Sequence, residues 1–198
     1  MAVHGNTRLR SDAQRNREHI LRIAHDAFAE LGATSLNEIA KRAGVGPGTL
    51  YRHFPTREAL ILAVYQHDVE RLVDSVPRVL AANAPLDAFR RWFRTLADYV
   101  RVKHGLGEAL YSAPVQDAIN KTYGPVVAAV GQLVDACIAE GSMRPGLDPG
   151  DILLLMGFLW RVDAAPEGKQ QAARIMEYVI EGLRPREAVG ELAYRTDR

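Results

Sequence analysis

Apolar residues recur three and four positions apart along almost the whole chain, and no stretch of any length alternates apolar and polar residues. Spacings of three and four place side chains on one face of an α-helix, whereas a half-buried strand needs strict alternation. The first such face is formed by Ile20, Ile23, Ala24, Ala27, Phe28 and Leu31. The pattern predicts an all-α fold of about nine helices with no β-sheet.

Capping residues predict where the first helices begin. Ser11 or Asp12 can cap the first helix. Ser35 and Glu38 fit a capping box, in which a hydroxyl and a carboxylate three residues apart start a helix. That second helix is expected to be short because Gly44 follows within about two turns.

Further breaks divide the rest of the chain. Residues 46–48 read Gly-Pro-Gly, which separates the second helix from a third over 49–54. Thr56 can cap a long fourth helix that begins near Arg57. Beyond Pro77 we expect five more helical stretches and a loosely ordered tail from about residue 185; the stretches lie near 86–103, 106–112, 115–140, 149–164 and 168–183.

Charge divides the chain into two parts, although the whole carries a net charge of only +1. Residues 1–57 hold nine Lys or Arg and five Asp or Glu, a net +4. Residues 58–198 hold 16 Lys or Arg and 19 Asp or Glu, a net −3. A basic head on an acidic body favours two domains with different tasks, divided near residue 57.

Residues 35–54 have the pattern of a helix-turn-helix, in which a second helix enters the major groove of DNA. Ile39 and Ala43 give the first of these helices an apolar face, and Gly44 allows a tight turn. Leu50 and Phe54 then point the apolar side of the second helix inward. The residues left on its start and outer face are Thr49, Tyr51, Arg52 and His53.

The run from 39 to 60, IAKRAGVGPGTLYRHFPTREAL, resembles the DNA-binding signature of TetR/AcrR-type regulators. The first-helix residues 20–32 also match that pattern, so the resemblance covers about residues 18–65. The connection from Gly32 to Ile39 is one or two residues shorter than usual in the family, which predicts a tighter turn. Length and helical pattern agree with the family over the whole chain.

The resemblance implies a double-stranded DNA operator as partner and assigns roles to individual positions. Thr49, Tyr51 and His53 match positions that contact phosphates or bases, while Pro47 and Arg52 lie where base edges are read. Arg57 matches a basic position that contacts the DNA backbone. The full set of expected DNA-binding residues is Ser35, Asn37, Pro47, Gly48, Thr49, Tyr51, Arg52, His53 and Arg57. Arg8, Arg10 and Arg15 form either a basic arm that reaches DNA or a solvated tail.

For residues 58–198 the resemblance implies a pocket for an unknown small-molecule effector and a homodimer interface. The expected pocket residues are Trp92, Leu96, Tyr99, Tyr123, Val127, Trp160 and Arg161. Residues 152–160 are apolar on nearly all sides, so a partner chain could cover one of them. The expected dimer residues are Leu155, Leu159, Ile175, Val179 and Leu183.

Other functions find little support in the sequence. The single cysteine, Cys137, excludes an internal disulfide and is expected to be buried and inert. The sequence contains no phosphate loop, nucleophile elbow or HExxH motif, so it predicts neither an enzyme nor a metal site. We find no secretory signal or uninterrupted apolar span, and expect a cytoplasmic protein.

The sequence therefore predicts a homodimeric repressor that a ligand releases from a palindromic operator. A regulator of the same fold in which the ligand strengthens DNA binding is the first alternative. A helical module or enzyme that kept a degenerate head is the second.

Overall fold

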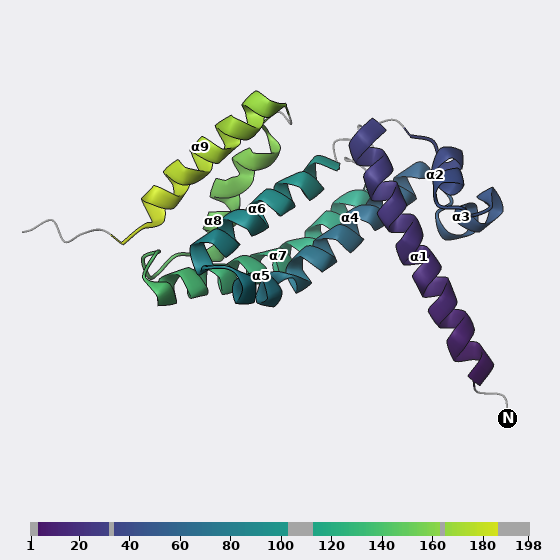
Figure 1. Ribbon diagram of the computed structural model, residues 1–198, viewed down its shortest axis with the longest axis horizontal. Helices are drawn as coiled ribbons and strands as arrows, with labels where there is room; N and C mark the ends of the chain where they lie inside the picture. Colours follow the sequence, from purple (N-terminus) through teal and green to yellow (C-terminus); the bar gives the residue numbers. More distant parts are fainter. Residues whose placement is uncertain (1–3, 32–33, 103–112, 163–164, 186–198) are drawn as a thin grey trace, which may run out of the picture. The chain divides into compact units, whose positions relative to one another are not determined.

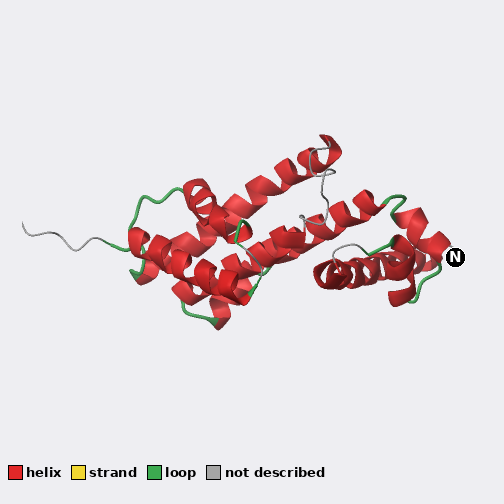
Figure 2. Ribbon diagram, turned by 90° about the horizontal axis from the view of Figure 1, so that it is seen from above, coloured by secondary structure: helices red, strands yellow, loops and turns green. Residues whose placement is uncertain are grey.

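The computed structural model describes residues 4–31, 34–102, 113–162 and 165–185, which contain nine α-helices, one 3-10 helix and no strand (Figures 1 and 2). The all-α prediction is confirmed. The elements are α1 (His4–Leu31), α2 (Leu36–Arg42), α3 (Pro47–His53), α4 (Arg57–Asp74), α5 (Val76–Ala82), α6 (Pro85–Val102), α7 (Ala113–Glu140), α8 (Pro149–Leu155), the 3-10 helix η2 (Met156–Trp160) and α9 (Pro166–Leu183).

The chain forms two compact units, and neither is continuous in sequence. Unit 1 consists of Met1–Ser75 and Thr95–Val126, and unit 2 of Val76–Arg94 and Val127–Arg198. Helices α6 and α7 therefore each contribute residues to both units. The functional division predicted near residue 57 stays a prediction.

Helices α2 and α4 begin at the caps that the sequence predicts, whereas α3 begins at Pro47, two residues before the predicted start at 49. The Ser35 hydroxyl accepts a hydrogen bond from the Glu38 amide at 3.2 Å and caps α2. Gly44 has a φ of +66°, a left-handed conformation that glycine adopts without strain. The Thr56 hydroxyl likewise accepts from the Ala59 amide at 3.1 Å and caps α4.

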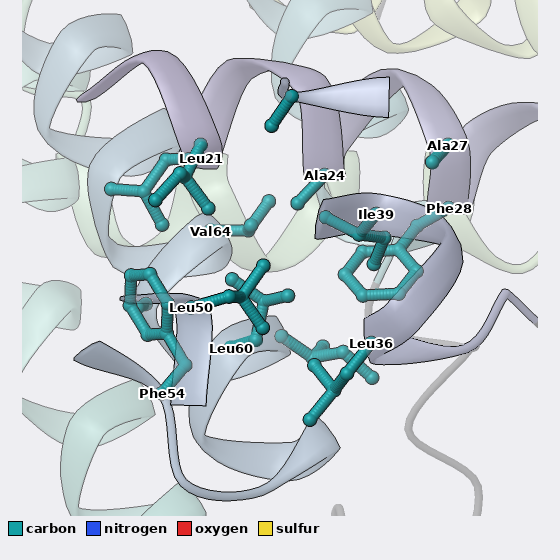
Figure 3. Packing of buried hydrophobic residues seen from close by; sticks show 14 of the residues in the cluster. Leu21, Ala24, Ala27, Phe28, Leu36, Ile39, Leu50, Phe54, Leu60 and Val64 are labelled. Atoms are coloured by element: carbon teal, nitrogen blue, oxygen red, sulfur yellow. The ribbon is translucent and has the colours of Figure 1, made fainter. Parts of the chain in front are cut away.

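A single apolar cluster holds α1 to α4 together (Figure 3). Leu50 from α3 and Phe54 just after it point into the cluster, 0% and 2% exposed. They pack with Leu21, Ala24, Ala27, Phe28, Leu36, Ile39, Leu60 and Val64. Because Leu50 and Phe54 are both buried, the residues between them point away from the core and form the outer face of α3.

Unit 2 has its own aromatic core. The rings of Phe89 and Phe93 lie 4.7 Å apart, and Trp92 meets Phe93 edge-on at 5.3 Å. Arg90 joins α6 to α9 through a two-pronged bond to Glu177, with Nε–Oε1 at 2.8 Å and Nη2–Oε2 at 2.7 Å. This paired geometry is specific to arginine and a carboxylate.

Some sequence expectations need correction, and others fall outside the described residues. Helix α1 begins at His4 rather than near Ser11, because no glycine or proline interrupts residues 6–31. Helix α5 was not expected, since Pro77 reads as a break but is tolerated in a first turn. The predicted helix over 149–164 is α8 followed by η2. The stretch 106–112 and the tail from 186 are not described.

One helical stretch among the described residues, Ile119–Glu140 in α7, is long and apolar enough to cross a membrane by length and composition alone. Lys121 and Asp135 interrupt it, and Leu133, Val134 and Cys137 are buried in unit 2. Core helices pass the same test, so this stretch is weak evidence for a membrane span.

Candidate nucleic-acid interface

The outer face of α3 carries the side chains predicted to contact DNA. Tyr51 is 44% exposed, and Arg52 and His53 are exposed beside it. They stand opposite Leu50 and Phe54, which are buried in the head. The helix-turn-helix therefore presents one aromatic and two basic groups to solvent, a combination suited to phosphates and base edges.

The start of α3 is open. Gly46 precedes the helix, Pro47 opens it, and Gly48 follows, all of them exposed. No protein atom lies within 4 Å of where a Cβ on Gly48 would stand, so internal packing does not require glycine at this position. The missing side chain leaves room for a molecule that approaches α3 from outside.

Arg52 is held along the helix surface. Its Nε donates to the Gly48 carbonyl at 3.1 Å, and its Nη2 donates to the Thr49 hydroxyl at 3.3 Å. These bonds lie on the same exposed face as Tyr51. Arg52 can exchange them for base or phosphate acceptors, since a guanidinium carries five donors.

The predicted residues outside α3 occupy two kinds of place. Ser35 and Asn37 are exposed at the start of α2, where the Ser35 oxygen already serves as the cap. Arg57 is half-buried: its Nε donates to the Thr34 carbonyl at 3.4 Å and its guanidinium carbon lies 5.4 Å from the Phe28 ring centre. Arg57 therefore ties the start of α4 to the segment before α2. The basic arm is part of α1 rather than a tail, since Arg8, Arg10 and Arg15 all lie in that helix.

The predicted pocket residues fall into both units. In unit 1, Leu96 is buried, Tyr99 is half-buried and Tyr123 is 57% exposed. In unit 2, Trp92 is buried, Val127 is half-buried and Arg161 is exposed. The Trp160 side chain lies outside the described set. The effector pocket stays a prediction.

The predicted dimer residues lie partly on a surface. Leu155 is 53% exposed, and Ile175 and Val179 are half-buried on α9. Leu159 and Leu183 are buried inside unit 2. Sequence reasoning did not single out two other exposed apolar side chains in the same elements, which are Leu154 and Tyr178. The excess of apolar residues in 152–160 could have pointed to an exposed Leu154, whereas no sequence pattern indicates that Tyr178 is exposed.

A half-buried ion pair in unit 1 also went unpredicted. His25 of α1 and Asp68 of α4 lie 2.7 Å apart (Nδ1–Oδ2), and Asp68 is buried. The ring of Tyr99 meets His25 edge-on at 5.6 Å. The hydrogen bond to Asp68 raises the pKa of His25 against the opposing effect of burial; the Asp68 and Asp26 charges also raise this pKa, and Arg71 lowers it. The partners are 43 residues apart, so no local motif reveals them.

The pair makes the stability of unit 1 depend on pH. Because its folded pKa is raised above 6.5, His25 contributes stability that is complete below pH 6.5 and is lost as pH rises through the folded pKa. Asp68→Asn should flatten this dependence and cost about 2 kcal/mol on the acid side, where the charge-assisted bond is present. Urea unfolding at several pH values measures it, with the exposed Asp74→Asn as control. An unchanged pH profile in Asp68→Asn would contradict the assignment.

Cys137 is buried in unit 2, and burial raises the pKa of its thiol to about 11. Reactive cysteines carry a lowered pKa, so the thiol has the character of a core residue.

Two sequence-family profiles match the chain. "Bacterial regulatory proteins, tetR family" matches residues 20–64, and "Transcriptional regulator SbtR-like, C-terminal domain" matches residues 84–185. The second match covers about half of the chain. Together they span both the helix-turn-helix and most of the remaining helices.

Solved structures agree over nearly the whole length. The TetR transcriptional regulator SCO0520 from Streptomyces coelicolor is 38% identical, with a TM-score of 0.73, over 86% of this chain and 99% of that one. The TetR transcription regulatory protein from Mycobacterium vanbaalenii is 34% identical, with a TM-score of 0.69, over 89% and 99%.

Curated relatives match over a shorter stretch. An HTH-type transcriptional regulator from Staphylococcus aureus (strain USA300) is 47% identical over 64 residues, which is 31% of this chain and 35% of that protein. The match thus spans about a third of the relative's length. The exposed α3 on a packed head agrees with these matches. The chain therefore belongs to the TetR family of DNA-binding transcriptional regulators and is not an enzyme.

Proposed function

We propose that the protein is a cytoplasmic homodimeric repressor that binds a palindromic operator and is released from it by a small-molecule effector. The observation that carries the DNA-binding part is the outward face of α3, where Tyr51, Arg52 and His53 stand clear of the core. The head around them has a net charge of +4, which favours association with a polyanion.

Dimerisation is supported by an apolar surface in unit 2. Leu154 is 79% exposed, Tyr178 is 71% exposed, and Leu155 lies next to Leu154 on α8. Exposed apolar side chains on neighbouring positions of one helix favour an interaction surface there, and a second copy of the chain is the partner that a two-fold operator requires. Two recognition helices would then read half-sites about 34 Å apart.

Selection of bound sequences from a random DNA pool, at stated near-physiological salt, tests this function. The expected result is a near-palindrome with half-sites one helical turn, or a multiple of it, apart. A featureless pool whose binding collapses with salt would mean contact with phosphates alone, and would contradict sequence-specific regulation.

Tyr51→Ala should weaken binding to the selected operator about tenfold or more, because a specific DNA contact contributes about 1–3 kcal/mol. The melting temperature should stay close to that of the parent, since nearly half of this side chain is already exposed. Tyr51→Phe is the matched control that keeps the ring and removes only the hydroxyl. Unchanged affinity in Tyr51→Ala would remove Tyr51 from the interface.

The direction of the effector response separates repressor from activator. Adding an effector to the protein–operator complex should lower operator affinity in a repressor of this kind. The effector must bind the DNA-free conformation more tightly, since differential affinity is the only means of shifting the equilibrium. A rise in operator affinity with effector would instead identify the activator or corepressor-type regulator.

A further inference from the structure

We propose that a cleft between α1 and α4 in unit 1 binds a small multivalent oxyanion, a molecule carrying phosphate groups or several carboxylates. The cleft has a volume of about 530 Å³, within the range of small-ligand sites. It lies within unit 1 and shares no residue with the predicted effector pocket. Its lining consists of Arg15, Glu18, His19, Arg22, His67 and Arg71.

The lining is strongly cationic. Three guanidinium groups and two imidazoles face one carboxylate. Among the described residues, no carboxylate lies within ion-pair distance of Arg22 or Arg71, whereas Arg42, Arg90 and Arg184 each pair with a glutamate. A concave surface with an excess of positive charge concentrates anions. An oxyanion would relieve the repulsion and occupy guanidinium donors in their preferred geometry.

Hydrogen bonds hold part of this lining in place. The Nε2 of His19 lies 3.2 Å from the Ala43 carbonyl, and the Nη2 of Arg22 lies 3.1 Å from the Nδ1 of His19. With Nε2–H donating to that carbonyl, Nδ1 is the acceptor for Arg22. Ala43 is the C-cap of α2, so the cleft connects through His19 to the turn of the helix-turn-helix. Arg22 keeps further N–H donors for a ligand.

The position on α4 favours a free anion over an operator phosphate. Helix α4 starts at Arg57, directly after the recognition helix, and Arg71 lies in its last turn. Fourteen residues at 1.5 Å each place Arg71 about 21 Å further along the helix axis than Arg57. In Figure 1, α2 and α3 lie on one side of α1 and the C-terminal half of α4 lies on the other.

The neighbouring ion pair supplies a reporter for binding. Asp68 follows the cleft residue His67, and His25 is three residues beyond Arg22. The positive charge of Arg71 lowers the pKa of His25, while Asp68 and Asp26 raise it and Tyr99 packs on its ring. An anion beside Arg71 offsets that positive charge, so its binding should raise the pKa of His25.

The test is titration of the full chain with inorganic pyrophosphate, followed by calorimetry and by NMR of the histidine rings, against sodium chloride at matched ionic strength. Saturable binding with one site per chain is expected, together with a higher His25 pKa. Arg22→Gln and Arg71→Gln should each weaken binding about tenfold. Arg78→Gln, an exposed arginine on α5, is the matched control and should bind like the parent. Circular dichroism confirms that each variant is folded.

Three outcomes would overturn the proposal. The first is no saturable binding of pyrophosphate beyond the chloride control. The second is equal weakening by Arg78→Gln, which would indicate general charge screening. The third is a fall of about one in the salt slope of operator binding in Arg71→Gln, which would assign the cleft to a DNA phosphate. The first two measurements contain no DNA, so their result is independent of the proposed repressor function.

Discussion

Replacing Leu50 with alanine is expected to lower the free energy of unfolding by about 3 kcal/mol. Leu50 is fully buried in the cluster that joins α1, α2, α3 and α4. A Leu→Ala change in a packed core removes transfer free energy and leaves a cavity, at a cost of about 2–5 kcal/mol. Because α3 is only seven residues long, it has little stability of its own apart from this anchor. Urea unfolding followed by circular dichroism measures the loss.

The adjacent residue provides the control for this prediction. Tyr51→Ala should change the free energy of unfolding by less than about 1 kcal/mol, because Tyr51 faces solvent while Leu50 faces the core. The two neighbours should therefore separate stability from operator binding. Equal destabilisation by both variants would mean that the face assignment of α3 is wrong.

Leu154→Asp is expected to convert a dimer to a monomer and to weaken operator binding about a hundredfold or more. The side chain is 79% exposed in the single chain, so aspartate costs little when the chain folds alone. At an apolar interface the same carboxylate would lose water without gaining a partner. Two linked heads bind far more tightly than one, because the second contact is intramolecular. Sedimentation and operator titration measure the two effects.

Gln132→Asp is the matched control for the interface, since Gln132 is exposed on α7 in the same unit. It adds the same charge at an exposed polar position and should leave both the mass in solution and the operator affinity unchanged. Leu155→Asp provides a second probe of the surface. Dimers that persist in both leucine variants would place the interface elsewhere.

The head could be predicted in detail because its determinants are local. Ser35, Gly44 and Thr56 each act within a few residues of their own position, through a cap or a turn. The apolar spacing around Leu50 and Phe54 then fixes which side of α3 is left for DNA. Each of these signals can be read without knowing any tertiary contact.

The cationic cleft and the His25–Asp68 pair could not be predicted in this way. The contacts that make them join α1 to α4 across more than forty residues. Sequence spacing gives the face of each helix but not how two helices cross, and the crossing brings Arg22 and Arg71 to one cleft.

The predicted dimer residues show a different limit, which concerns helix type. Leu155 and Leu159 are four residues apart and would share a face of an α-helix. Leu155 is exposed, whereas Leu159 is buried. The 3-10 helix η2 begins between them and turns by about 120° per residue instead of about 100°, which rotates Leu159 toward the core. A 3.6-residue period therefore assigns the wrong face after Met156.

The discontinuity of unit 1 limits how such a regulator can be recombined. The chain leaves this unit at Ser75, returns at Thr95 and leaves again at Val126. A fragment cut after α4 would lose the partner of the Tyr65 hydroxyl, which lies 2.8 Å from that of Thr122, and the Tyr99 ring that meets His25. Grafting a foreign DNA-binding head at a single junction after α4 would replace Tyr65 and His25 but keep their partners Thr122 and Tyr99. Chimaeras with new operator specificity should therefore exchange only the outward residues of α3, and keep α1 and α4 together with the α6 and α7 residues that they contact.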